Sequence, residues 1–254
     1  MDKIPNTPLT KWRLFCLSCR CLFLQSSWNY KQFQGLGWCV ALLPHLTHLY
    51  GKERVAQVLK GYLKYFNTNT FLAPTIAAAT LSIETETCRG EPVTIDGQSY
   101  PDVVMAPVAA VGDGLFWGGI RPFLSVLAVC FAVYGYWWSP LFLIISFNIP
   151  AGIFRVVGVW LGYHQGASVV LLIQRWRLAD IAVVLKRCTV VVAGGLCAVL
   201  THQHQLEFMW SLVGSFVVIV TLFLTVICLR KGVPLTVVLI GMIAGVTAVN
   251  KLLL

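Results

Sequence analysis

From Val103 to its end, the chain consists of apolar runs in which only Asp113, Asp180 and Glu207 are acidic. A run of about 20 apolar residues suits a helix that crosses the roughly 30 Å hydrocarbon layer of a bilayer. The whole chain is 57% hydrophobic and 11% charged, whereas soluble domains are about 25% charged. The sequence therefore predicts an all-α polytopic integral membrane protein rather than a soluble one.

Charge divides the chain into two parts. Ten of the 19 basic residues and seven of the 10 acidic residues lie at or before Asp102. We therefore expect an amphipathic N-terminal part, residues 1–102, and a membrane-spanning part, residues 103–254. The net charge of +9 does not indicate a nucleic-acid partner, because the basic residues stand singly or in pairs at the ends of apolar runs, as membrane topology requires.

The N-terminal part predicts helices that do not cross the membrane. Apolar residues recur at helical spacing over Lys11–Phe23 and over Glu53–Phe66, which indicates two amphipathic helices, the first lying in the membrane interface. Phe71–Ile83 is apolar but too short to span, and it contains Pro74, so we expect a re-entrant hairpin there. Glu84–Asp102 predicts a hydrophilic loop.

The spanning part predicts about five or six spanning helices. The apolar runs are Val103–Ile120, Pro122–Trp138, 140–174, Ile181–Leu200, Trp210–Leu229 and Val233–Val249. Basic residues place Arg175–Arg187 and Arg230–Lys231 in the cytoplasm, and their absence places His202–Glu207 outside. The loop around Ser139 also carries no Lys or Arg, which places it outside. The chain must therefore cross the membrane an odd number of times between Ser139 and Arg175. Because 35 residues cannot make three crossings, we expect one crossing plus a broken or re-entrant half-helix near Pro150.

Asp113 is the sharpest candidate for a functional residue. A carboxylate inside an apolar segment is costly and normally faces a cavity or a partner. Arg121 is the obvious candidate for a purely structural ion pair, but eight residues of helix separate the two side chains by about 12 Å. A direct pair would therefore need a break in the helix, and a functional role for Asp113 is favoured.

Two further polar groups stand in apolar surroundings. In "YFNTNTF", Asn67 and Thr68 suit either the capping of a helix or a hydrogen-bonding site for a polyol, since an amide both donates and accepts. In "LQSSWNYKQFQG", Trp28 and Asn29 place a flat ring beside an amide, which together could hold a small polar molecule. These groups join Asp113 as candidates for a binding site.

The sequence shows no pattern typical of an enzyme or of a cofactor site. Cys16, Cys19 and Cys21 form a C-x-x-C-x-C cluster without the further ligands that a structural zinc site needs. His202 and His204 are a pair without a third ligand. We therefore expect no metal, no cofactor and no catalytic histidine in this chain.

Four blocks resemble the IID membrane subunit of the mannose–fructose–sorbose family of the bacterial sugar phosphotransferase system. They are "LFLQSSWNYKQFQGLGWCVALLP", "YLKYFNTNTFLAPTIAAATLSIE", "APVAAVGDGLFWGGIRPFLSVLA" and "SPLFLIISFNIPAGIFRVVGVWLGYHQG". The similarity runs in order from Lys11 to the region of Leu200. The family usually has His-Pro after the "FNT" triplet, where this chain has Asn69-Thr70.

The resemblance implies a multi-pass subunit of the bacterial inner membrane that works with a IIC subunit in a larger oligomer and carries a hexose-type sugar. Separate cytoplasmic IIA and IIB subunits would hold the phosphohistidines, so whether this chain counts as an enzyme is left open. The sugar path would be lined by Trp28, Asn29, Asn67, Thr68 and Asp113. Two alternatives remain: a non-transporting membrane scaffold for a partner transporter, and an intramembrane transferase, for which a convergent acid–base set is missing.

Overall fold

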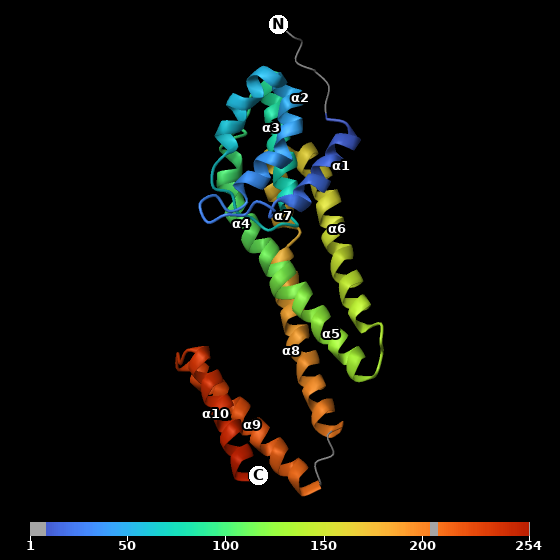
Figure 1. The fold of residues 1–254 in the computed structure, drawn as a ribbon, viewed down its shortest axis with the longest axis vertical. Coiled ribbons are helices and arrows are strands. Elements are labelled where there is room, and N and C mark those ends of the chain that lie inside the picture. Colours follow the sequence, from blue (N-terminus) through green and yellow to red (C-terminus); the bar gives the residue numbers. More distant parts are fainter. Residues whose placement is uncertain (1–8, 204–207, 254) are drawn as a thin grey trace. The chain divides into compact units, whose positions relative to one another are not determined.

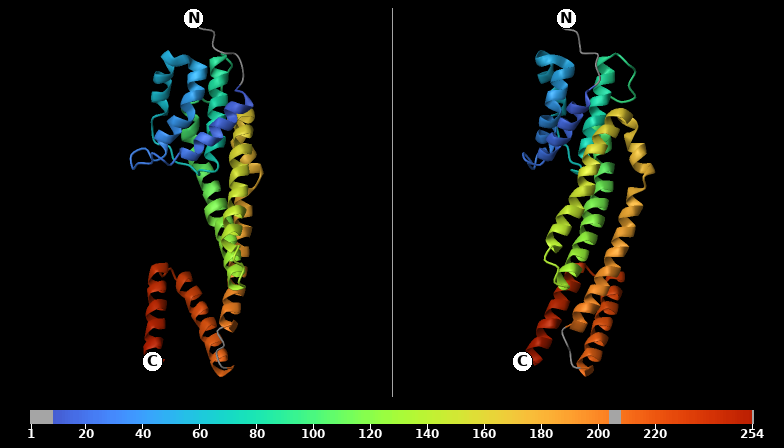
Figure 2. Two further views of the ribbon diagram at one scale, coloured as in Figure 1. Left: turned by 45° about the vertical axis from the view of Figure 1, so that its right-hand side comes forward. Right: turned by 90° about the vertical axis from the view of Figure 1, so that its right-hand side faces the viewer.

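The computed structural model describes residues 9–203 and 208–253, which are helical throughout apart from short connections. The helices form two compact units that divide after Ala193 (Figures 1 and 2). The first unit holds α1 (Lys11–Arg20), α2 (Gly35–Tyr62), α3 (Ala73–Cys88), α4 (Tyr100–Leu115), α5 (Arg121–Val133), α6 (Ser139–Gln165), α7 (Val169–Arg175) and the start of α8 (Leu178–Gln203). The predicted all-α class is confirmed.

The second unit begins at Gly194 and holds the end of α8 and two further helices, α9 (Phe208–Arg230) and α10 (Leu235–Leu253). The turn between them is built on Gly232, whose φ of +81° is a conformation that glycine adopts without strain. Apolar residues cover most of the described surface of both helices. The helices predicted for the last three apolar runs are therefore confirmed as helices.

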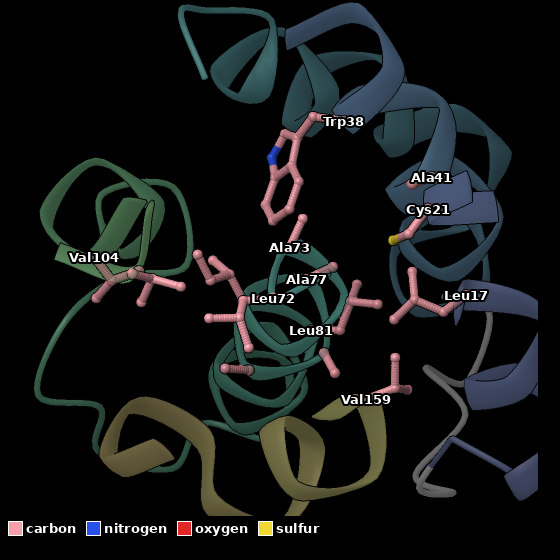
Figure 3. Close-up of a cluster of buried hydrophobic side chains, with 14 of the residues drawn as sticks. Leu17, Cys21, Trp38, Ala41, Leu72, Ala73, Ala77, Leu81, Val104 and Val159 are labelled. Atoms are coloured by element: carbon pink, nitrogen blue, oxygen red, sulfur yellow. The ribbon is translucent and has the colours of Figure 1, made fainter. Parts of the chain in front are cut away.

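The central element of the first unit is α3, whose side chains form the core shown in Figure 3. Residues of α1, α2, α4 and α6 surround it, so nearly all of it is buried. The prediction of a hairpin over Phe71–Ile83 is wrong, because this segment enters one continuous helix. Pro74 lies in its first turn, where a missing N–H costs nothing. The helix also continues to Cys88, which shortens the loop predicted from Glu84.

The contact between α3 and α6 depends on two glycines of α6. A Cβ atom at Gly158 would lie 2.2 Å from Thr75 Oγ1, and a Cβ atom at Gly162 would lie 2.2 Å from the Thr75 carbonyl oxygen. Neither position therefore has room for a side chain. Small residues spaced four apart let two helix backbones approach closely, as in membrane helix pairs.

The two predicted amphipathic helices are present. α1 and the 3₁₀ turn Cys21–Phe23 cover the predicted segment Lys11–Phe23. The second is the later part of α2, which follows a break at Gly51 (φ +76°, ψ 166°) and ends at Tyr62 rather than Phe66. Its apolar stripe faces the core, as amphipathic spacing requires.

The apolar run Val103–Ile120 and most of the run Pro122–Trp138 lie in one continuous helical stretch, Tyr100–Val133, rather than in two helices. A π-helix, Phe116–Ile120, joins α4 to α5, and the Arg121 N–H bonds to the Phe116 carbonyl five residues back. The wider turn of the π-helix, a feature frequent at functional sites, immediately precedes Pro122, which lies in the first turn of α5.

The half-helix expected near Pro150 lies elsewhere. α6 passes through Pro150 without a break and ends at Gly166, where φ is +52°. A short 3₁₀ turn, Gly166–Ser168, then leads into α7, which has seven residues. A long helix followed by a short one is therefore present, but the break between them lies at Gly166 rather than near Pro150, and the single crossing stays a prediction.

Two helical stretches among the described residues are long and apolar enough to cross a membrane, Tyr100–Val133 and Ser139–Leu200. The most apolar window of the second stretch contains no buried residue, unlike the core helix of a soluble protein. Their surface therefore suits a lipid environment. The total of five or six crossings stays a prediction.

Candidate functional site

Two connecting segments lie side by side: the first loop, residues 24–34, and the second loop, residues 63–72. The Gln34 N–H donates to the Phe66 carbonyl at 2.9 Å, and the Phe66 N–H donates to the Gln32 carbonyl at 3.2 Å. The buried Gln34 side chain also accepts from the Thr68 N–H and donates to the Thr68 carbonyl. Backbone and side-chain bonds together therefore hold the second loop against the first.

Glycines in the "QGLGW" stretch let these segments come so close. A Cβ atom at Gly35 would lie 2.1 Å from the Lys64 carbonyl oxygen, and one at Gly37 would lie 2.3 Å from the Leu24 carbonyl oxygen. The obstructing atoms are backbone, which cannot swing aside as a flexible side chain can. The two glycines are thus required by the packing of the loops.

Trp28 belongs to a partly exposed aromatic cluster, formed by Trp28, Tyr30, Phe33 and Tyr65. Its ring meets the Tyr30 and Phe33 rings edge-on, with centroids 5.0 and 5.2 Å away, and Phe33 meets Tyr65 at 5.2 Å. Such edge-to-face pairs are the favoured geometry for aromatic side chains. Trp28 remains 43% exposed, so part of its ring is free to cover the apolar face of a ligand.

Asn29 is already engaged by the first loop. Its Oδ1 accepts from the N–H groups of Lys31 and Gln32 at 3.0 and 2.9 Å, and its Nδ2 donates to the Ser27 carbonyl at 3.3 Å. Asparagine commonly closes a turn in this way. The acceptor capacity of Asn29 is therefore used locally, and one amide N–H is left for a ligand.

Asn67 and Thr68 differ in how they are used. The Thr68 hydroxyl donates to the Met105 carbonyl of α4 at 3.0 Å, and Thr68 is buried. Asn67 is half-buried, and within the described residues its side chain makes no hydrogen bond. Thr68 thus ties the second loop to α4, while the Asn67 amide keeps its donors and its acceptor.

Asn69 is the direct partner of Asp113. Its Nδ2 donates to Asp113 Oδ1 at 2.7 Å, and its Oδ1 accepts from the Phe71 N–H at 2.9 Å. Asn69 is only 2% exposed and packs on Gly112, where a Cβ atom would lie 2.5 Å from the Asn69 side chain. The Asp113 carboxylate itself is exposed in the isolated chain. The buried Asn69 amide therefore orients the Asp113 carboxylate, which remains accessible to a ligand or a partner.

Sequence reasoning missed Asn69 as a site residue. The alternation of Asn and Thr in "NTNT" just before a proline-led helix was the available signal. It indicates capping, and the structure confirms this in part, because the Asn69 carbonyl accepts from the Leu72 and Ala73 N–H groups. The long-range bond to Asp113 has no counterpart in local sequence.

Arg121 does not neutralise Asp113. Among the described residues no ion pair involves Asp113, and the Arg121 guanidinium lies over the Trp117 ring, 5.4 Å from its centroid. This agrees with the spacing argument from the sequence. The Lys186 side chain of α8 lies beside the π-helix that follows Asp113, since a Cβ atom at Gly118 would be 3.3 Å from Lys186 Nζ.

Sequence reasoning also missed a buried carboxylate near the start of the second loop. Glu84 of α3 is 4% exposed, and its two oxygens accept from the hydroxyls of Tyr50 and Tyr62. Burial, followed by the hydrogen bond to Glu84 and its negative charge, raises the pKa of each tyrosine above the ordinary value. Because Tyr62 ends α2, this contact holds the point from which the second loop departs.

The structure therefore gathers the candidates around the second loop. This loop carries Asn67 and Thr68, reaches Asp113 through Asn69, and touches the aromatic cluster of Trp28 through Tyr65. Asn29 lies on the adjoining first loop. In residues 9–203 and 208–253, no group of three or more His, Cys, Asp or Glu side chains is placed to hold a metal ion.

Long, exposed apolar helices that meet two polar loops define a helical membrane protein. The chain is similar to a solved chain of the mannose transporter ManYZ in complex with microcin E492, with a TM-score of 0.58, 25% identity, and 96% of this chain and 97% of that chain covered. A second structure, titled a membrane protein, has a TM-score of 0.71 at 24% identity over 96% of this chain and 98% of that one, and shares the fold.

The family model for the PTS system mannose/fructose/sorbose family IID component matches residues 8–253. The chain therefore belongs to this family, and the resemblance seen in the sequence is confirmed. It is 28% identical to the sorbose-specific EIID component of Lacticaseibacillus casei, over 80% of each chain. It is 34% identical to the mannose-specific EIID component of Escherichia coli K12, over 58% of this chain and 53% of that protein. The match to the mannose-specific relative thus spans about half of its length.

Proposed function

We propose that this chain, paired with a IIC subunit, carries a hexose-type sugar across the bacterial inner membrane. Cytoplasmic IIA and IIB subunits supply the phosphoryl group, and IIB transfers it to the arriving sugar. Membership of the IID family supports the complex. The observation that carries the role of this chain is the exposed Asp113 carboxylate, held by the buried Asn69 amide.

The chemistry of the site suits a sugar. A carboxylate accepts hydrogen bonds from hydroxyls, and the unpaired Asn67 amide donates to one hydroxyl and accepts from its neighbour. The exposed part of Trp28 covers an apolar ring face, while Thr68 and Asn29 hold the loops in place. Phosphorylation traps the sugar inside, because a charged product cannot recross a hydrocarbon barrier.

The proposal is tested by reconstituting uptake. Cells that lack their own mannose-family system receive this chain alone, or together with IIA, IIB and IIC subunits from the same source. We expect accumulation of phosphorylated sugar only with the complete set. Full uptake in cells that receive only the IIA, IIB and IIC subunits would contradict a transport role for this chain, and uptake by this chain alone would contradict the need for a IIC partner.

We also expect a defined orientation in the membrane. The segment Arg175–Arg187 and the pair Arg230–Lys231 lie in the cytoplasm, and the end of α8 lies outside, because positive residues stay inside. A single cysteine placed at Gln203, in a background without native cysteines, should react with an impermeant thiol reagent in intact cells. Labelling that appears only after the membrane is permeabilised would show that the orientation is the reverse of the one expected. The rest of the predicted outer loop, residues 204–207, lies outside the described residues.

A further inference from the structure

The exposed side of α6, which carries Ile153, Val157 and Trp160, is a ridge with a groove on each flank. The first groove lies between α6 and α1, has a volume of about 290 Å³, and is lined by Lys11, Phe15 and Trp160 among others. The second lies between α6, α3 and α7, has a volume of about 230 Å³, and includes Leu172. Val157 lines both grooves, so they adjoin along one helix.

The lining of both grooves is almost wholly apolar, and much of it is open. Ile153, Val157 and Trp160 on the ridge are 55%, 44% and 50% exposed. Two adjoining apolar channels on either side of one residue match the two acyl chains of a diacyl lipid, each of whose buried CH₂ groups contributes favourably. A soluble ligand would find few polar partners along either groove.

One basic side chain, Lys11, lines the end of the first groove where α1 begins. The Leu9 N–H donates to the Tyr163 hydroxyl at 2.9 Å, which places the start of α1 beside the end of α6. Lys11 lines the groove there, and His164 contacts the Trp160 ring with centroids 4.5 Å apart. This end of the groove therefore suits an anionic headgroup rather than a neutral one.

The surrounding sequence strengthens this charge preference. Residues 9–30 contain no acidic side chain and three basic ones: Lys11, Arg13 and Arg20. Within the part of the chain that the structure describes, the buried His45 has no hydrogen-bond partner on either ring nitrogen. Burial, followed by the charges of Arg13 and Arg20, lowers its pKa to about 4. Unneutralised basic residues near a membrane surface attract anionic lipids.

The exposed side of α1 also fits the depth of lipid headgroups. Its outward residues include Trp12 and Phe15, and the following 3₁₀ turn exposes Leu22 and Phe23. Aromatic and basic residues on one short helix are typical of a segment lying in the membrane interface. The groove thus begins at headgroup level and continues along α6.

We propose that an anionic diacyl phospholipid binds here, with its chains in the two grooves on either side of Val157 and its phosphate beside Lys11. The second groove reaches Leu72 at the end of the second loop, but neither Asn67 nor Asp113 lines either groove. The bound lipid anchors α1 to α6 and so steadies the base on which α3 packs. The proposal does not depend on which sugar is carried.

Native mass spectrometry of the full chain, extracted in mild detergent together with its membrane partner, tests the proposal. Dioleoyl phosphatidylglycerol, dioleoyl phosphatidylethanolamine and free glycerol phosphate are titrated separately. We expect phosphatidylglycerol to bind about tenfold more tightly than phosphatidylethanolamine, because one charge-assisted bond distinguishes them. Glycerol phosphate should not compete. Equal binding of the two lipids, competition by glycerol phosphate, or no binding because a partner subunit covers the grooves would overturn the proposal.

Matched variants locate the site. Lys11→Gln should remove the preference for phosphatidylglycerol, whereas Lys52→Gln, on the exposed part of α2, should keep it. Val157→Trp fills both grooves and should abolish retention of either lipid, while Val191→Trp, on α8 at a position that is 75% exposed, should not. If the two lysine variants or the two tryptophan variants behave alike, the lipid is not bound here. The melting temperature of each variant shows that it has folded.

Discussion

Asp113→Asn is expected to lower sugar uptake by about tenfold or more, because the site loses a hydrogen bond to a charged group. The amide has the shape of the carboxylate, and its oxygen can still accept from Asn69 Nδ2, which lies 2.7 Å from Asp113 Oδ1. The level of the variant in the membrane should therefore stay unchanged. Uptake of labelled sugar in cells that contain the complete set of subunits measures the effect.

A control carboxylate is available on the same helix. Asp102 pairs with Lys64 at the surface, and the two side chains are 44% and 36% exposed. Surface ion pairs contribute little, so Asp102→Asn should transport normally. If both variants transport normally, Asp113 does not face the sugar path. If both lose uptake, the effect is not specific to the site.

Exchanging the two partners separates charge from hydrogen bonding. Asn69→Asp alone brings a second carboxylate against Asp113 and should impair uptake, since like charges at this distance oppose each other. The double variant Asn69→Asp/Asp113→Asn keeps the bond and the net charge but moves the carboxylate into a buried position. We expect the double variant to reach the membrane at a normal level but not to regain uptake. Full recovery of uptake would show that the bond alone matters.

Gly162→Leu is expected to destabilise the protein strongly. Its Cβ atom would lie 2.2 Å from the Thr75 carbonyl oxygen and 3.1 Å from the carbonyl carbon. Backbone atoms cannot move aside, so α3 and α6 must separate, and overpacking of this kind costs about 1–3 kcal/mol or more. The apparent melting temperature of the detergent-purified protein should fall by about 5 °C or more, and less protein should reach the membrane.

Gly152→Leu is the matched control, because Gly152 lies on the same helix and no atom from another part of the protein lies within 4 Å of its added Cβ. It should keep the normal melting temperature and membrane level. Equal losses for the two variants would mean that any leucine in α6 is harmful. Equal tolerance would contradict the close contact between α3 and α6.

Composition and periodicity predicted most of the helices but not how they are joined. The apolar runs around Ile120 were read as two segments because Arg121 and Pro122 interrupt them, yet a π-helix carries the chain through. Near Pro150 the same error occurred, because a break was predicted there, whereas α6 continues through the proline and Gly166 ends it. A proline can be accommodated within a helix when neighbouring turns adjust, and local sequence does not reveal that adjustment.

The candidate site was predictable in part. The cost of a charge in an apolar run singled out Asp113, and the amide–hydroxyl stretch singled out Asn67 and Thr68. The role of Thr68 as a tie to α4 and the bond from Asn69 depend on residues 37 and 44 positions away. Asn29 looked free in the sequence, but a turn of its own loop uses its acceptor.

The sequence by itself determined that this is a helical membrane protein of the IID family, because apolar runs, basic flanks and ordered motifs are properties of the chain alone. Only the tertiary structure decided that α3 is a buried central helix rather than a hairpin, and that Asn69 holds Asp113. The physical reason is that burial and long-range hydrogen bonds depend on which helices meet. That meeting is set here by single glycines such as Gly158 and Gly162, whose importance appears only when the opposing backbone is in place.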